Sequence, residues 1–342
     1  MKLACLSFTD KGRLLGERLL ALDSNTYKME HISNSQIQGG IKGFLESSWS
    51  KYDGFIFISA TGIAVRMCQP YIESKDIDPA IVVIDDEGKF SISLLSGHLG
   101  GANEIAKSIG DFIGATPVIT TASDNRGIDS IDMFAKENGY YIEELSSVTK
   151  ITSMMVNSKT VGIYTEDGNL INYPNLIKLD DLNNIDPSVE GIIIVTSRED
   201  IGPIDIPYTI LRPKNLNIGI GCRKGKEVEI VLEAIELALN NSNLSNKSIR
   251  AMGTVEIKKD EIGIIKAAEH YNCPLEIFTI EDILPLEDIF QKSQFVRDTI
   301  GVYSVSEPCA YLLGGKPILG KFIHEGVTIS INLNIYDEKE NL

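Results

Sequence analysis

The stretch Ser96-Gly97-His98-Leu99-Gly100-Gly101-Ala102-Asn103-Glu104 joins an apolar run at 90–95 to a segment with helical spacing of its apolar residues. The run predicts a strand and the spacing predicts a helix. In an α/β protein, a strand-to-helix turn lies at the carboxyl edge of the sheet, where backbone N–H groups and the positive helix end bind ligands. Three glycines, a hydroxyl, an imidazole, an amide and a carboxylate in one such turn predict the active site.

Length and composition are typical of a globular protein with several domains. A chain of 342 residues exceeds what one hydrophobic core usually supports, and this predicts two or three domains. No apolar run approaches the roughly 20 residues needed to cross a bilayer. Residues 1–8 are interpreted as a first strand instead of a signal peptide. We therefore expect a cytoplasmic protein with no membrane partner.

Charge and cysteine usage argue against several kinds of site. Forty-eight acidic against 32 basic residues give a formal charge of −16, which argues against a nucleic-acid partner. The five cysteines form no Cys-x-x-Cys pair, and the four histidines have no spacing that places two on one helix face. We expect neither disulfides nor a protein metal site. Anionic small molecules remain candidate ligands wherever basic residues cluster.

Alternating strand and helix patterns predict three consecutive α/β units, at 1–139, 140–213 and 214–342. Within the first unit, residues 78–95 are expected to form a hairpin around an acidic turn that contains Gly88. The first and third units have strand–glycine turn–helix edges suited to a ligand. The central unit has connections rich in Asn, Asp and Pro, and we interpret it as a scaffold.

Two further polar turns of the first unit resemble the one around His98. They follow the predicted strands at 53–59 and 115–121, and their candidate ligand-binding or catalytic residues are Thr61, Gly62, Arg66, Asp124 and Arg126. We expect these three loops to line one shared cleft in which guanidinium groups bind an anion. For Arg66, an ordinary capped helix with a solvated arginine is an equally good interpretation.

The third unit opens with a glycine-rich turn and two cations. Gly219-Ile220-Gly221 lacks the third glycine of a dinucleotide fingerprint, and no Walker pattern follows. Arg223 and Lys224 stand just before a helical pattern, so we interpret them, with Gly221, as a clamp for a carboxylate or phosphate. A solvated pair of cations is the alternative.

His98 is the strongest single candidate for a catalytic residue. An imidazole titrates near neutral pH, and beside exposed backbone amides it supplies a general base and an oxyanion site together, which suits hydrolysis of an ester-like bond. Asp124 or Glu104 is available to orient the ring. The other candidates in the turn are Ser96 for catalysis and Gly97, Gly100, Gly101 and Asn103 for substrate binding. A ligand-sensing module that binds an anion without turnover remains the alternative.

Two motifs carry a resemblance that covers nearly the whole chain. Residues 94–104 with 117–124, followed by Gly-Ile-Gly-Cys-Arg-Lys-Gly at 219–225, resemble the cobalamin biosynthesis CbiG family, the cobalt-precorrin-5A hydrolases of the anaerobic pathway. The C-terminal part is also similar to CobE of the aerobic pathway. The family's N-terminal, central and C-terminal domains agree with the three predicted units.

The resemblance implies a macrocyclic substrate that already contains cobalt, so no cofactor of the protein is expected. Opening of the δ-lactone of cobalt-precorrin-5A, with loss of C20 and its methyl group as acetaldehyde, would leave cobalt-precorrin-5B. On this basis His98 activates water, and amides at Gly100 and Gly101 stabilise the oxyanion. Neighbouring pathway enzymes and a second copy in a homodimer are possible partners. A non-catalytic carrier of a tetrapyrrole or another anionic ligand is the alternative function.

Overall fold

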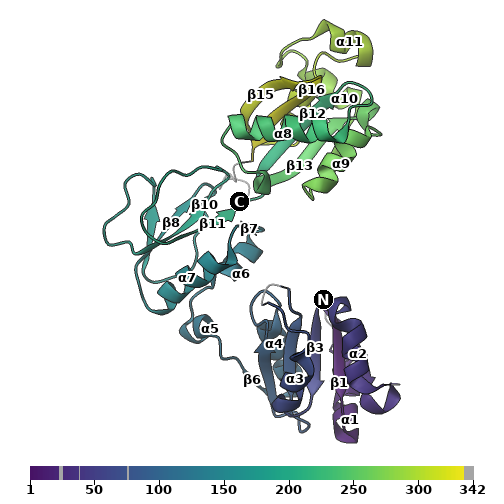
Figure 1. The fold of residues 1–342 in the computed structure, drawn as a ribbon, viewed down its shortest axis with the longest axis vertical. Coiled ribbons are helices and arrows are strands. Elements are labelled where there is room, and N and C mark those ends of the chain that lie inside the picture. Colours follow the sequence, from purple (N-terminus) through teal and green to yellow (C-terminus); the bar gives the residue numbers. More distant parts are fainter. Residues whose placement is uncertain (23–25, 38, 75–76, 335–342) are drawn as a thin grey trace. The chain divides into compact units, whose positions relative to one another are not determined.

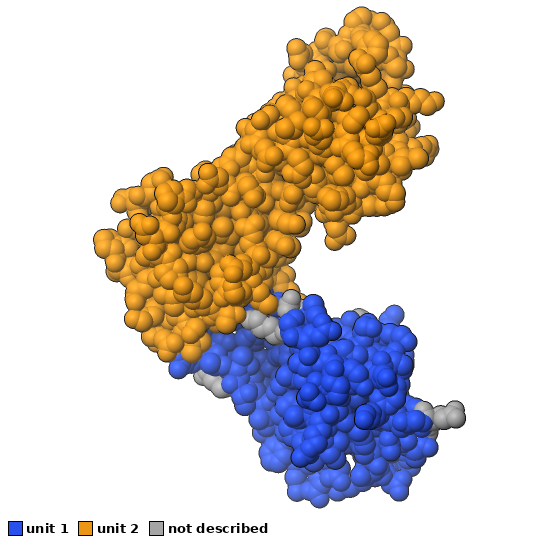
Figure 2. All heavy atoms as spheres, viewed as in Figure 1, with its two compact units in different colours: residues 1–134 blue, residues 135–342 orange. Residues whose placement is uncertain are grey.

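The computed structural model describes residues 1–22, 26–37, 39–74 and 77–334, so the last residues of the predicted third unit lie outside the described part. The chain divides into two compact units, residues 1–134 and 135–342 (Figure 2). Over the described residues, the first unit contains one sheet and the second contains two. The expected α/β fold class is confirmed, whereas the domain boundaries at 139/140 and 213/214 stay a prediction. No helix in the described ranges is long and apolar enough to span a membrane.

The described residues of the first unit form a six-stranded sheet in the order β2-β1-β3-β4-β5-β6 (Figure 1). Its strands are β1 (Lys2–Ser7), β2 (Lys28–Ser33), β3 (Gly54–Ile58), β4 (Ala80–Ile84), β5 (Phe90–Leu95) and β6 (Thr116–Val118). The helices in this part of the chain are α1 (Asp10–Leu19), α2 (Gly40–Ser48), α3 (Thr61–Cys68), α4 (Ala102–Ile113) and α5 (Ala122–Arg126). A further helix, α6 (Ile131–Glu137), begins in the first unit and ends in the second.

The central strands are apolar throughout because helices cover both faces of this sheet. On β1, Leu3 and Cys5 pack in one core cluster with buried residues of α1 and α4. Ala4 and Leu6 point the other way and pack in a second cluster with residues of α2 and α3. A strand buried on both faces has no polar side to alternate with, which explains the continuous apolar runs in the sequence.

The chain reverses direction between β4 and β5 at an acidic turn. Asp85 closes this turn, because its side chain accepts the backbone N–H groups of Lys89 at 2.8 Å and Phe90 at 2.7 Å. Gly88 has a φ of 67°, in the left-handed region that glycine adopts readily. β5 is consequently antiparallel to β4, whereas β1, β2, β3 and β4 run parallel. The predicted hairpin is confirmed.

This reversal corrects the prediction of one shared cleft. Leu95, at the end of β5, pairs with Ile81 near the start of β4, so the Ser96–Gly101 turn lies at the edge where β3 and β4 begin. The turn after β3, with Thr61 and Arg66, lies at the opposite edge, separated by the length of the five-residue strand β3, about 17 Å. Since β6 is parallel to β5, the loop that follows β6 lies at the His98 edge.

The second unit begins with a sheet whose described strands are ordered β7-β11-β10-β8-β9. The strands are β7 (Tyr141–Ile142), β8 (Val161–Thr165), β9 (Leu176–Leu179), β10 (Gly191–Val195) and β11 (Tyr208–Arg212), with one long helix, α7 (Leu145–Val156). All pairs are parallel except β7 with β11. Ile192 and Ile194 on β10 are completely buried in its core.

The other sheet of the second unit has the described order β14-β13-β12-β16-β15. Its strands are β12 (Leu216–Cys222), β13 (Ile249–Val255), β14 (Leu275–Phe278), β15 (Lys316–His324) and β16 (Val327–Leu333). Its helices are α8 (Val228–Asn241), α9 (Ile262–His270), α10 (Ile280–Ile283), α11 (Gln294–Ile300) and α12 (Ser306–Leu312). β12, β13 and β14 are parallel, and β16 is antiparallel to β12.

Gly219 is required by helix packing in this sheet. A Cβ at this position would lie 1.8 Å from the Ser306 carbonyl oxygen and 2.5 Å from the Ala310 nitrogen, both on α12. On the opposite face, Ile218 and Ile220 pack in a core cluster with α8 and α9. Gly219 therefore permits the close approach of a helix to a strand.

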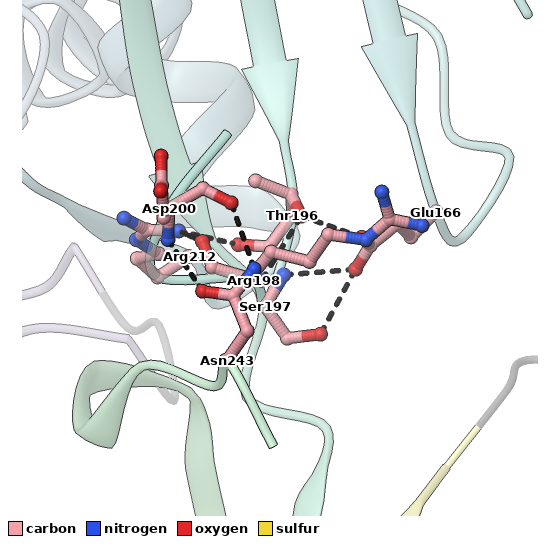
Figure 3. Close-up of polar contacts among 7 residues, drawn as sticks. All are labelled: Glu166, Thr196, Ser197, Arg198, Asp200, Arg212 and Asn243. Atoms are coloured by element: carbon pink, nitrogen blue, oxygen red, sulfur yellow. Dashed lines mark hydrogen bonds and ion pairs between the residues drawn. The ribbon is translucent and has the colours of Figure 1, made fainter. Parts of the chain in front are cut away.

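Hydrogen bonds join the loop after β10 to the turn after α8 within the second unit (Figure 3). The Asn243 side chain accepts the Asp200 N–H at 2.8 Å and donates to the Asp200 carbonyl at 2.9 Å. Its own carbonyl accepts the Glu199 N–H at 3.1 Å. Arg212, only 1% exposed, donates to the Thr196 carbonyl at 3.3 Å and pairs with Glu143 at 2.8 Å. This network links the two sheets of the unit.

Replacement of Asn243 with alanine is expected to loosen this junction. The change removes two side-chain hydrogen bonds, each worth about 1 kcal/mol, at a residue whose φ of 53° disfavours alanine. We expect the thermal unfolding midpoint to fall by roughly 4–8 °C, and Asn243→Gly, which tolerates the backbone angle, to lose less. Asn240→Ala, at an exposed position of α8, is the control. Equal midpoints for the Asn243 and Asn240 alanine variants would contradict this role.

Candidate active site

His98 lies between carboxylates of the first unit. Its Nε2 is 2.9 Å from Asp124 Oδ2, and its Nδ1 is 3.5 Å from Asp132 Oδ1. The Ser123 hydroxyl oxygen lies 3.3 Å from the same Nε2. The His98 side chain is 17% exposed and that of Asp132 is 10% exposed. Polar groups of the same unit thus orient the imidazole from both ring nitrogens.

These carboxylates favour the charged form of the imidazole. The contact with Asp132 has the largest effect and raises the pKa of His98, partial burial lowers it, and Asp124 raises it further. For Asp132, burial has the largest effect and raises the pKa, but contacts with His98 and Ser130 together outweigh it and bring the pKa to about 2. The contact thus favours a charged imidazolium facing an ionised Asp132.

The backbone of the turn is tightly folded around Ser96. Ser96 has a φ of 54°, and a Cβ on Gly100 would lie 2.4 Å from the Ser96 Cβ, so glycine is required at position 100. The Ala102 N–H donates to the Ser96 carbonyl at 3.1 Å, and the Gly101 N–H donates to the His98 carbonyl at 2.9 Å. The Gly101 amide is therefore already used within the turn, which disfavours its predicted role as an oxyanion donor.

Asn103 positions Asp124. Its side-chain nitrogen donates to Asp124 Oδ2 at 2.9 Å and to Thr121 Oγ1 at 3.1 Å. Asn103 is buried, with 5% of its surface exposed, in the first turn of α4. The helix that follows the His98 turn thus holds the loop that follows β6.

The structure does not bring every predicted residue of the first unit to His98. Among the described residues, the carboxylates within 4.0 Å of the His98 ring nitrogens are those of Asp124 and Asp132, so Glu104, exposed on α4, does not orient the ring. Arg66, at the opposite edge, donates to the Gly62 carbonyl of its own helix at 3.1 Å. Arg126 is exposed at the end of α5.

In the second unit, Gly221, Arg223 and Lys224 line a cavity of about 470 Å³. Two further lysines, Lys258 and Lys321, also line it. These side chains could bind an anionic ligand. Burial is the main cause that raises the pKa of the Cys222 thiol in the same cavity to about 11, so this thiol is uncharged at neutral pH. Within the described ranges, no three His, Cys, Asp or Glu side chains are placed to hold a metal ion.

Comparisons with known proteins identify the family. The model "Cobalamin synthesis G N-terminal" matches residues 43–124, "Cobalamin biosynthesis central region" matches 130–213, and "Cobalamin synthesis G C-terminus" matches 216–332. The chain is 34% identical to the cobalt-precorrin-5A hydrolase of Salmonella typhimurium, over 97% of each chain. The chain belongs to the cobalamin biosynthesis protein G family. This confirms the resemblance seen in the sequence, and the relative's name agrees with the prediction of a hydrolase.

Solved structures related to this family member include a cobalamin biosynthesis protein G homolog from Sulfolobus solfataricus. It is 25% identical, covers 96% of each chain and has a TM-score of 0.41. CobE, a protein from the cobalamin biosynthetic pathway, is 24% identical and matches 35% of this chain and 89% of its own, with a TM-score of 0.32.

Two partners of His98 in this family member, Asp132 and Ser123, were not predicted from the sequence. Asp132 stands in the first turn of a helix that follows Ser130, where an acidic residue is expected for helix stability alone. Ser123 lies in the short helix α5 beside Asp124. Neither position has a local signal that separates a site residue from an ordinary helix start.

Replacement of His98 with glutamine is expected to change stability in a pH-dependent way. A His pKa raised by folding contributes stability that is fully present below about pH 6.5, the unfolded value, and is lost as pH rises through the folded pKa. The parent should therefore have a higher unfolding midpoint than His98→Gln. The difference between the two midpoints should be largest near pH 6 and should decrease toward pH 9.

The matched control is His270→Gln, at an exposed position on α9. Its difference from the parent should stay constant over the same pH range. A His98→Gln gap that does not change between pH 6 and pH 9 would show that the carboxylates do not stabilise the imidazolium.

Proposed function

We propose that this chain is a cobalt-precorrin-5A hydrolase, which opens the δ-lactone of its substrate and releases acetaldehyde to give cobalt-precorrin-5B. The observation that carries the proposal is the placement of His98 between Asp124 and Asp132, at a strand-to-helix turn of the first unit. An ionisable imidazole held by carboxylates is suited to moving protons during hydrolysis of an ester-like bond. The name of the Salmonella typhimurium relative supports the choice of substrate.

The proposed reaction consumes one water and balances in two stages. Water adds to the lactone carbonyl, the acyl–oxygen bond breaks, and the products are a carboxylic acid and a hydroxyl group on C20. Loss of the hydroxyl proton then forms the C=O bond of acetaldehyde and breaks the bond from C20 to the ring. The electron pair of that bond passes to the macrocycle. Cobalt enters within the substrate, so the proposal requires no cofactor of the protein.

We assign proton transfer to Asp124 and His98 together. Both ring nitrogens of His98 face carboxylates, and its pKa is raised, so the ring is better suited to donating a proton than to taking one from water. His98 and Asn103 both bond to Oδ2 of Asp124. We assign the other oxygen, Oδ1, to the proton of the attacking water, and the imidazolium to the departing alkoxide. This revises the role of general base expected for His98.

Other groups of the turn have supporting roles in the proposal. Asp132 is a positioning residue, because it contacts His98 and lies behind it in a buried position. The amide of Gly100 is the candidate donor to the oxyanion, now that the Gly101 amide bonds to the His98 carbonyl. Ser96 shapes the turn through its left-handed backbone.

Loss of either member of the pair should abolish most of the activity. With cobalt-precorrin-5A supplied anaerobically, we expect Asp124→Asn and His98→Gln each to lower the rate of acetaldehyde release by about 10²–10⁴-fold. Glu104→Gln is the control, since Glu104 is exposed and does not contact His98. Acetaldehyde release at the parental rate by His98→Gln would show that His98 takes no part in the reaction.

The pH dependence of the rate separates the two roles considered for His98. If the imidazolium is the active form, the rate falls as pH rises through the raised pKa of His98. A rate that rises through the same pKa would return the role of general base to His98. Binding of the substrate with no acetaldehyde under any condition would favour the non-catalytic carrier over the hydrolase.

A further inference from the structure

Loops from several strands of the C-terminal sheet contribute to the cavity lined by Gly221, Arg223 and Lys224. β12 and β13 are parallel neighbours, so the turn at Arg223 and the 3-10 turn at Lys258 follow them at the same sheet edge. Val327 on β16 pairs with Cys222, which brings the β15–β16 turn to this edge as well. In open α/β sheets, ligands bind outside the carboxyl ends of the strands.

The cavity is locally cationic although the whole protein is acidic. The described residues that line it include four cations, Arg223, Lys224, Lys258 and Lys321. No Asp or Glu is among these described lining residues. The formal charge of the chain is −16. Glu261, next to the cavity, offsets the charge of Lys258, whereas the described lining contains no acidic partner for the other three cations. The cavity is therefore suited to a ligand with more than one negative charge.

Lys258 is buried and held in place by a carboxylate, unlike a solvated surface lysine. It is 9% exposed, and its Nζ lies 3.0 Å from Glu261 Oε1. The other oxygen of Glu261 accepts the Gly225 N–H at 2.8 Å. Glu261 thus holds Lys258 next to the turn that carries Arg223. A buried lysine fixed in this way has little freedom left to lose when an anion binds.

Apolar side chains form the other part of the cavity lining. Phe295 is 66% exposed and Ile323 is 62% exposed, which is high for large apolar residues. Val296 and Ile300 on α11 and Val305 before α12 add to this surface. A small hydrophilic anion such as phosphate would leave these side chains in water, whereas a ligand with an apolar body would cover them.

We propose that this cavity binds the carboxylate side chains and part of the apolar ring system of a polycarboxylated tetrapyrrole. This inference rests on the proposed function for the class of ligand, but it concerns binding in the second unit, separate from proton transfer at His98. Lys258 and Lys321 each bind a carboxylate, while Phe295 and Ile323 contact the ring. A volume of about 470 Å³ lies within the range of small-molecule sites.

The test uses uroporphyrin III, a commercial tetrapyrrole with eight carboxylates, titrated into the full chain and followed by porphyrin fluorescence. We expect Lys258→Met and Lys321→Met each to weaken its binding about 10-fold or more, because each removes a charged hydrogen bond. Lys258→Arg, which keeps the charge, should recover part of the affinity. Phe295→Ala should weaken binding at any salt concentration, whereas the effect of the lysines should shrink as salt rises.

The matched control is Lys266→Met, because Lys266 is exposed on α9, pairs with Glu269 and does not line the cavity. It should bind uroporphyrin III as the parent does. Equal affinity of the parent, Lys321→Met and Phe295→Ala would overturn the inference, as would complete displacement of the porphyrin by inorganic phosphate. If the cavity variants kept both the parental affinity for uroporphyrin III and the parental KM for acetaldehyde release, this inference would be overturned while the proposed function stood. If porphyrin binding depends on the cavity residues but the parent releases no acetaldehyde, this inference is supported and the proposed hydrolase function is contradicted.

Discussion

The reversal of the chain at Asp85 determines which polar residues of the first unit meet. Because β5 runs against β4, the His98 turn lies at the edge where the parallel strands begin. β6 follows the direction of β5 and delivers Asp124 to the same edge. A parallel β5 would have placed His98 beside Arg66 instead. The hydrogen bonds from Lys89 and Phe90 to the Asp85 side chain stabilise the turn at which this reversal takes place.

Both candidate sites use a buried ionic contact to hold a charged group in place. In the first unit Asp132 holds His98, and in the second unit Glu261 holds Lys258. In each pair the lysine or imidazole is the group directed toward the proposed ligand, and the carboxylate sets its position. A buried charge without its partner would carry a large desolvation cost, and each carboxylate offsets part of that cost.

Parts of the site that depend on local sequence were predictable, and parts that depend on long-range pairing were not. The strand, the glycine turn and the helix around His98 follow from apolar runs and glycine positions. Asp132 follows 34 residues after His98, in a pattern that any helix start shows, so nothing local marks it. The alternating pattern of the third unit led to Arg223 and Lys224. Lys258 and Lys321 were missed because they come from other strands.

The sequence by itself determined the α/β class, the family and the two turns that carry the candidate chemistry, because apolar periodicity and short motifs are local properties of the chain. It also predicted the hairpin at 78–95. Only the tertiary structure decided which turns share an edge, since strand direction reverses the end of the sheet at which a loop emerges. It also placed carboxylates on both sides of His98, and the contacts with Asp132 and Asp124 raise the pKa of the ring, because residues far apart in the chain meet there only when it folds.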